Sequence, residues 1–218
     1  AGFLTAASAL ARVYPDDGPH LVYLPERAFD MDKFLADVKK VYDERKRCLV
    51  AVSEGISDKE GTAIAAKFSK EVDAHGNVQL SGSGALGDLL ANEVKTKLQI
   101  SRVRADTFGY LQRSFPGVFS AVDAKEARTV GGLAVKHAVA GAYTSGSVAI
   151  RRKPGKKYQT FFELVPLQNV AKETRHMPDE FINAEGNNVT KAFIDYAAPI
   201  VGPLPKIGRF KAVKVPKK

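Results

Sequence analysis

One pattern constrains the fold more than any other: a predicted strand, helix and second strand follow one another near the start of the chain. Residues 20–24 (HLVYL) are typical of a short buried strand, and 48–53 (CLVAVS) form a continuous apolar run typical of a strand covered on both faces. Between them, Asp30 is a favourable N-cap for a helix that continues to about Lys46. Strand, helix and strand at these distances predict a right-handed βαβ unit in a parallel sheet.

The rest of the chain alternates in the same way, which favours an α/β fold. Helices are expected at 3–12, 61–71, 85–98, 123–140 and within 181–196. A strand that enters a loop is expected over 101–110, and 147–152 and 158–165 are expected to form a hairpin across a basic turn. We expect an α/β domain over residues 1–150, then a hairpin, a short helix and a basic tail over 151–218 that complete the fold.

The positive charge is concentrated in two places. The 218 residues carry 33 Lys and Arg against 24 Asp and Glu, a formal charge of +9. Eleven of the basic residues lie in the turn 151–157 and the tail 206–218, which contain no acid, and the remaining 22 face 24 acids. This distribution favours a solvated turn and a flexible terminus over a nucleic-acid-binding domain. No apolar run approaches the roughly 18 residues of a membrane span. The charge distribution and the lack of such a run together lead us to expect neither nucleic acid nor membrane as a partner.

Cysteine and histidine usage limits the chemistry that the chain can support. A single cysteine, Cys48, excludes an internal disulfide and a cysteine-based zinc site, and it indicates a reducing compartment. It lies in an apolar run and is expected to be inert. The four histidines are scattered, which argues against a histidine metal site. The chain begins AGFLTAASALA, without a basic region or an initiator Met, and we expect it to be cut from a longer protein.

A glycine-rich segment at 82–87 (GSGALG) matches G-x-G-x-x-G and opens a predicted helix. The dinucleotide fingerprint also needs a firm strand before the first glycine, and only 77–80 (NVQL) precedes it. A loop followed by a helix start is therefore the better interpretation.

Glu54 follows the apolar strand at 48–53 directly. In open α/β sheets ligands bind at the carboxyl ends of the strands, and a carboxylate there can accept hydrogen bonds from sugar hydroxyls. Glu54 could equally cap the next turn, and spacing alone does not separate the two roles.

The densest polar cluster lies at 102–113 (RVRADTFGYLQR), where Arg104 and Arg113 flank a Gly-Tyr turn. Guanidinium groups suit a doubly charged phosphate, and the Tyr110 hydroxyl and Gln112 offer neutral hydrogen bonds. The alternative is a surface strand whose arginines pair with Asp106, and composition alone slightly favours it.

Taken in order, these residues resemble the phosphofructokinase family. Residues 104–113 are similar to its sugar-phosphate-binding motif, 52–55 (VSEG) to its Glu-Gly strand end, and 20–26 (HLVYLPE) to another of its strands. The opening AGFLTAA resembles the continuation of a Met-Gly-Arg-x-Ala-Gly motif whose first four residues are absent. The resemblance implies a Rossmann-like three-layer sandwich with a mainly parallel sheet, of the phosphofructokinase type, plus a C-terminal hairpin extension.

Tyr110 stands where ATP-dependent bacterial members carry His, and Ser114 and Phe115 replace their Gly-Gly. These differences favour the pyrophosphate-dependent branch. The resemblance then implies transfer of a phosphoryl group from pyrophosphate to the 1-hydroxyl of fructose 6-phosphate, assisted by Mg²⁺. It also implies a cytoplasmic glycolytic enzyme that is usually a homo-oligomer.

The resemblance also assigns roles by position. Glu54 would bind sugar hydroxyls, Tyr110 and Arg113 would hold the 6-phosphate, and Arg104 would reach that phosphate across a subunit interface. Leu111 and Gln112 complete the expected substrate-binding set.

The family's Gly-Gly-Asp donor loop and Thr-Ile-Asp-Asn-Asp base motif do not occur in the sequence. We therefore expect no catalytic residue and no Mg²⁺ ligand in this chain, and we expect both upstream of it. On its own the chain should bind substrate poorly and catalyse nothing.

Two alternatives remain open. The first is the ATP-dependent form of the enzyme, because the donor-site residues that choose between the forms are absent from the sequence. The second is a non-catalytic phosphate-binding or regulatory subunit of the same family. The presence of Glu54, Arg104 and Arg113 argues against such a degenerate site.

Overall fold

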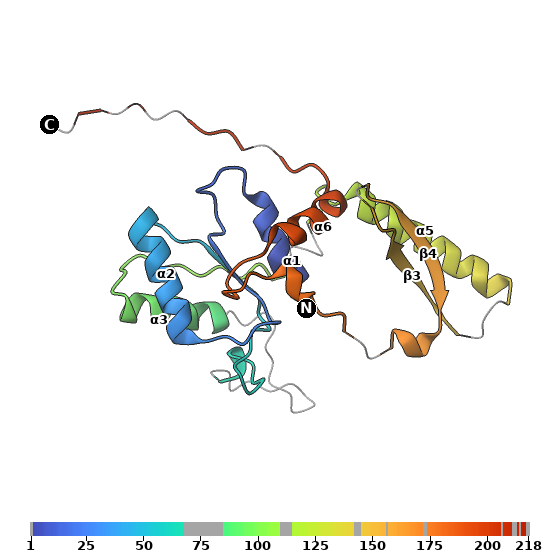
Figure 1. Cartoon of the computed structure of the whole chain (residues 1–218), viewed down its shortest axis with the longest axis horizontal. Coiled ribbons are helices and arrows are strands. Elements are labelled where there is room, and N and C mark those ends of the chain that lie inside the picture. Colours follow the sequence, from blue (N-terminus) through green and yellow to red (C-terminus); the bar gives the residue numbers. More distant parts are fainter. Residues whose placement is uncertain are drawn as a thin grey trace.

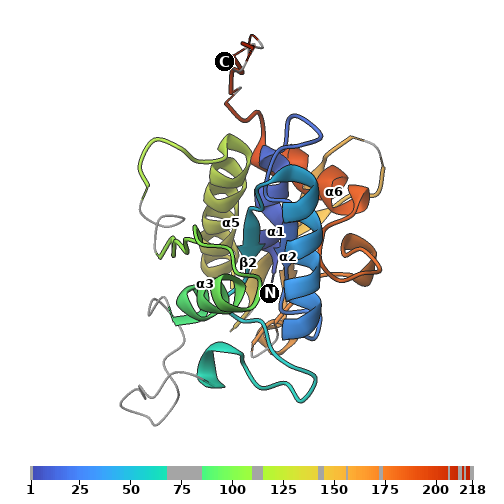
Figure 2. The same ribbon diagram turned by 90° about the vertical axis from the view of Figure 1, so that its left-hand side faces the viewer.

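A computed structural model describes most of the chain, and Figures 1 and 2 show its arrangement. The described residues are 2–67, 85–109, 115–141, 145–155, 157–171, 174–205, 207–210, 213 and 215–216. None of the helices in this part of the chain has the length and apolar character needed to span a bilayer.

The predicted βαβ unit is confirmed. β1 (Leu21–Tyr23) pairs in parallel with β2 (Val50–Val52), and α2 (Met31–Arg45) connects them. The Asp30 side chain caps α2 by accepting a 2.9 Å hydrogen bond from the backbone N–H of Lys33. A cap of this kind satisfies one of the free N–H groups of the first helical turn.

Helices cover both faces of the parallel pair, which gives the three layers expected from the resemblance. Because side chains alternate along a strand, Leu21 and Tyr23 enter one cluster with α2 and α3 (Ala85–Lys97), whereas Val22 enters another. This second cluster is built with α1 (Phe3–Ala7) and α6 (Lys191–Val201). A 3-10 turn, η1 (Ser8–Ala11), extends α1. Figure 2 shows α2 and α3 in front of β2.

The outer edge of β1 is covered by the loop that precedes α6. The backbone N–H of Val22 donates to the carbonyl of Asn187 at 2.8 Å, and the Asn188 side-chain amide donates to the carbonyl of His20 at 3.1 Å. An uncovered edge would expose unpaired backbone groups to other chains. Residues far apart in sequence therefore complete one layer.

The predicted hairpin is also confirmed. β3 (Ser147–Arg152) and β4 (Thr160–Val165) pair antiparallel, and α5 (Ala121–Val139) packs against β3. The buried Glu126 of α5 accepts hydrogen bonds from the hydroxyls of Tyr158 and Thr160. Figure 1 shows this unit to one side of the other helices. The expected division between residues 150 and 151 falls inside β3.

One expected element differs from the structure because a side chain directs the backbone into a turn. Instead of a helix from residue 61, the Asp58 carboxylate accepts from the backbone N–H groups of Glu60 and Thr62, and Gly61 has φ +79°. A bridge joins Ser57 to Ala63, and only the short 3-10 turn η2 (Ala65–Lys67) follows before the described segment ends at residue 67. Turns of this kind compete with helix formation.

The shorter helix expected within 181–196 is present as α6, which begins inside this range and ends beyond it, at Val201. The Asn183 side-chain oxygen accepts from the N–H groups of Asn187 and Asn188, which holds this segment in a loop, and α6 starts only at Lys191. Two further 3-10 turns are η3 (Leu167–Asn169) and η4 (Asp179–Phe181). The strand expected over 101–110 is not found: the described residues 101–109 form an irregular segment without strand pairing.

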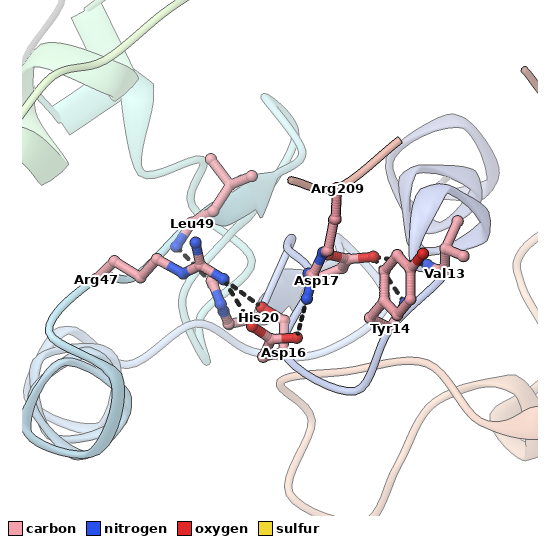
Figure 3. Close-up of polar contacts among 8 residues, drawn as sticks. All are labelled: Val13, Tyr14, Asp16, Asp17, His20, Arg47, Leu49 and Arg209. Atoms are coloured by element: carbon pink, nitrogen blue, oxygen red, sulfur yellow. Dashed lines mark hydrogen bonds and ion pairs between the residues drawn. The ribbon is translucent and has the colours of Figure 1, made fainter. Parts of the chain in front are cut away.

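The loop before β1 contacts both Arg47, just beyond α2, and Arg209 of the C-terminal tail (Figure 3). The Arg209 guanidinium donates to the Asp16 carboxylate at 2.9 Å and to Asp17, and it lies 4.1 Å from the centroid of the Tyr14 ring. Arg47, just beyond α2, also donates to Asp16, at 3.1 Å. The hydrogen bond from Arg209 lowers the pKa of Asp16. Within the described part of the tail, Arg209 is thus paired with the loop before β1.

The N-cap of α2 provides a test of the fold. Replacing Asp30 with Ala removes the oxygen that accepts from Lys33, so the free energy of unfolding should fall by about 1 kcal/mol. Urea unfolding measures it. The matched control is Asp32→Ala, which removes a carboxylate from the first turn of the same helix without removing the cap. An equal loss in both variants would contradict the assigned role of Asp30.

Candidate functional site

The turn that carries Glu54 begins where β2 ends. The backbone N–H of Ser53 donates to the carbonyl of Tyr23 at 3.0 Å, which continues the parallel pairing by one residue. Ile56 then closes the turn, because its N–H donates to Ser53 and its side chain is completely buried. Glu54 is therefore an exposed carboxylate on an anchored turn at the carboxyl end of the parallel pair.

The carboxylate of Asp37, on α2, fixes the side chain of Tyr23. The Tyr23 hydroxyl donates to Asp37 on α2 at 2.8 Å, and Asp37 also accepts from the Asn187 amide at 2.7 Å and from Lys33 at 3.1 Å. Desolvation opposes the charge on Asp37, but these three donors outweigh it and lower the pKa of the carboxyl group. Desolvation and the bond to Asp37 both raise the pKa of Tyr23. Tyr23 is thus held at its backbone by Ser53 and at its side chain by Asp37.

Arg104 lies on the extended segment that follows α3. Val103, immediately before it, packs against the same hydrophobic cluster as Val52, two residues before Glu54. Arg104 itself is exposed. The carboxylate and the guanidinium are thus carried by two segments anchored in one cluster, one after β2 and the other after α3.

Four members of the predicted set, Tyr110, Leu111, Gln112 and Arg113, lie outside the described residues. Residues 82–84 of the glycine-rich segment 82–87 do as well, and its described half, 85–87, begins α3.

The other sequence candidates have structural roles where they are described. Burial raises the pKa of the Cys48 thiol to about 11, so the thiol is protonated and unreactive at neutral pH. In the basic turn, Arg151 pairs with Glu163 at 2.8 Å, and Arg152 lies over the rings of Tyr158 and Tyr196. Both arginines are engaged by the protein itself, which favours the structural interpretation of this turn over an anion site.

A hollow of about 270 Å³ opens beside the end of β1, and its lining includes Arg27 and Lys33. Arg27 pairs with Asp179 at 2.7 Å and Lys33 with Asp37 at 3.1 Å, so both cations are already neutralised. Within the described ranges, no group of three or more His, Cys, Asp or Glu side chains could hold a metal ion.

Comparisons with known proteins identify the family. The phosphofructokinase family model matches residues 1–138, more than half of the chain, so the chain belongs to the phosphofructokinase family. It is 58% identical over 204 residues to the pyrophosphate–fructose 6-phosphate 1-phosphotransferase of Rhodospirillum rubrum, covering 93% of this chain and 50% of that protein. It is 35% identical to the enzyme of the same name from Xanthomonas campestris, covering 100% and 53%.

Solved structures agree with the sequence relatives. The crystal structure of a pyrophosphate-dependent phosphofructokinase from Nitrosospira multiformis matches with a TM-score of 0.75 at 30% identity, covering 100% of this chain and 52% of that one. The corresponding enzyme from Marinobacter aquaeolei gives 0.75 at 27% identity, covering 97% and 47%. The fold is therefore of the phosphofructokinase type, as the resemblance implied. The chain spans about half the length of the curated relatives that it matches.

The network at Asp37 predicts a particular pH dependence of stability. Because folding lowers the pKa of Asp37, its contribution is present above pH 4 or so and is lost as the pH falls through the folded value. Asp37→Asn should therefore cost about 1 kcal/mol at pH 7 and progressively less in acid. Urea unfolding between pH 7 and pH 3 measures the difference.

The control for this prediction is Asp43→Asn. Asp43 lies on the same helix and forms an ion pair with the exposed Lys39. Asp43→Asn should change the free energy of unfolding much less than Asp37→Asn over the same pH range. A loss at Asp37 that stayed the same at every pH would show that the charge of this residue is not what stabilises the fold.

Proposed function

We propose that this chain is the sugar-phosphate-binding part of a cytoplasmic glycolytic enzyme that phosphorylates fructose 6-phosphate with pyrophosphate as the donor. The observation that supports it most is the anchored turn at the carboxyl end of β2, which presents Glu54 where ligands of parallel sheets bind. The identity of 58% to a relative named for this reaction supports the same substrates.

In this proposal, Glu54 accepts hydrogen bonds from hydroxyls of the sugar. Tyr110 and Arg113 hold the 6-phosphate, with Leu111 and Gln112 beside them. Arginine suits this task because its guanidinium is permanently charged and can donate two parallel hydrogen bonds to phosphate oxygens. Phosphoryl transfer needs positioning and neutralisation of charge more than covalent chemistry from the protein. The roles proposed for these side chains meet that need on the acceptor side.

The remaining parts of the reaction are assigned outside this chain. The catalytic base, the residues that contact pyrophosphate and the ligands of Mg²⁺ are proposed to belong to the other half of a protein about twice as long. Mg²⁺, when bound there, would neutralise charge on the transferred phosphoryl group. Arg104, which is exposed on the segment after α3, is proposed to act across the interface of a homo-oligomer.

The choice of donor is tested with the full-length protein that contains this sequence. Production of fructose 1,6-bisphosphate is followed with either pyrophosphate or ATP, in the presence of Mg²⁺. Pyrophosphate should support turnover and ATP should not. Equal or exclusive use of ATP would replace the pyrophosphate assignment with the ATP-dependent form, and inactivity with both donors would favour a non-catalytic subunit.

The acceptor side is tested by substitution. Arg113→Ala should raise the KM for fructose 6-phosphate at least tenfold, about 1.4 kcal/mol of lost binding, because a charged partner of the phosphate is removed. Arg104→Ala should change KM in the same direction. Arg102→Ala is the matched control, since Arg102 is exposed on the same segment but lies outside the family motif. An unchanged KM in Arg113→Ala would remove this residue from the pocket.

A further inference from the structure

Helix α3 and the segment that carries Arg104 approach each other unusually closely at one glycine. A Cβ atom placed on Gly87, in the first turn of α3, would lie 3.1 Å from the Cβ atom of Ala105 and 4.0 Å from the hydroxyl oxygen of Thr107. A separation of 3.1 Å between two carbon atoms is shorter than the optimum of about 3.5–4.0 Å for such contacts. A side chain at residue 87 would therefore require the neighbouring segment to move by a few tenths of an ångström.

The contact is not local in sequence, because α3 lies between its two sides. The chain turns back at Gln99, a non-glycine residue with φ +56°, and then runs past the amino-terminal end of the helix from which it came. Ile100 and Val103 pack against the hydrophobic cluster and fix the first part of this return. Beyond Val103, Ala105 and Thr107 are exposed to solvent. Both residues nevertheless lie close to Gly87.

From this geometry we infer that Gly87 is a positioning residue for substrate binding: it sets the distance between α3 and the segment 104–107, and thereby the place of Arg104. The inference rests on the proposed function, in which Arg104 contacts the 6-phosphate. Sequence reasoning missed this role because Gly87 looked like the last glycine of a weak phosphate-loop pattern. The distance to Ala105 is visible only in the folded chain.

The direction of the effect follows from what can move. Leu86 and Leu90 are buried on either side of Gly87, which holds the helix in place. The segment 104–107 is exposed and can yield by a few tenths of an ångström. A methyl group at position 87 is therefore expected to displace Arg104 rather than to unfold the protein, and it also favours the helical conformation over glycine.

The test is Gly87→Ala in the full-length protein, with steady-state kinetics and thermal unfolding. The KM for fructose 6-phosphate should rise about fivefold with kcat within about twofold, because misplacement of a binding group weakens ground-state contacts. The melting temperature should not fall. A second substitution, Ala105→Gly, removes the opposing methyl group and should bring the KM of the double variant back to within about twofold of the wild type.

Gly131→Ala is the matched control, since Gly131 also lies inside a helix and an added Cβ there meets no atom within 4 Å. It should leave KM unchanged. An unchanged KM in Gly87→Ala, or a raised KM that Ala105→Gly does not restore, would overturn the inference.

Amide hydrogen exchange of the peptide covering 102–109 separates this inference from the proposed function. Gly87→Ala should speed exchange there, the double variant should restore it, and Gly131→Ala should have no effect. If the wild-type protein does not use fructose 6-phosphate, the proposed function fails. Hydrogen exchange then decides by itself whether Gly87 holds the segment 104–107. An unchanged exchange rate in Gly87→Ala would overturn this inference too.

Discussion

The parallel pairing of β1 with β2 is the interaction on which the rest of the structure depends. Only three residues of each strand pair, in the register Leu21 with Val50 to Tyr23 with Val52. Because side chains alternate along the strands, this short pair contributes Leu21 and Tyr23 to one hydrophobic cluster and Val22 to the other. One cluster collects α2 and α3, and the other collects α1 and α6, so a disturbance of the pair would affect both.

The same pairing connects the core to the candidate site. The ladder ends with the hydrogen bond from Ser53 to Tyr23, and Glu54 is the next residue. Tyr23 is in turn held by Asp37, which also binds Asn187 from the C-terminal part of the chain. The position of one exposed carboxylate therefore depends on segments from three regions of the sequence. On the Arg104 side, burial of Val103 and the close approach at Gly87 play the corresponding role.

Much of this organisation could be predicted from the sequence because it arises from local signals. The apolar run at β2, the Asp30 cap and the hairpin pairing of β3 with β4 each arise from signals within a few residues, and all three appear as expected. The helix expected from residue 61 was wrong because the Asp58 side chain satisfies the backbone of a loop there. Helical spacing alone does not reveal such competition.

The sequence by itself determined the parallel unit, the family and the residues proposed to bind the sugar phosphate, because motif identity and hydrophobic periodicity are properties of neighbouring residues. Only the tertiary structure decided how these residues are supported. The contact between Gly87 and Ala105, the carboxylate of Asp37 and the ion pair of Arg209 with Asp16 join positions that are far apart along the chain. Their partners are chosen by packing and charge in three dimensions, which no local pattern encodes.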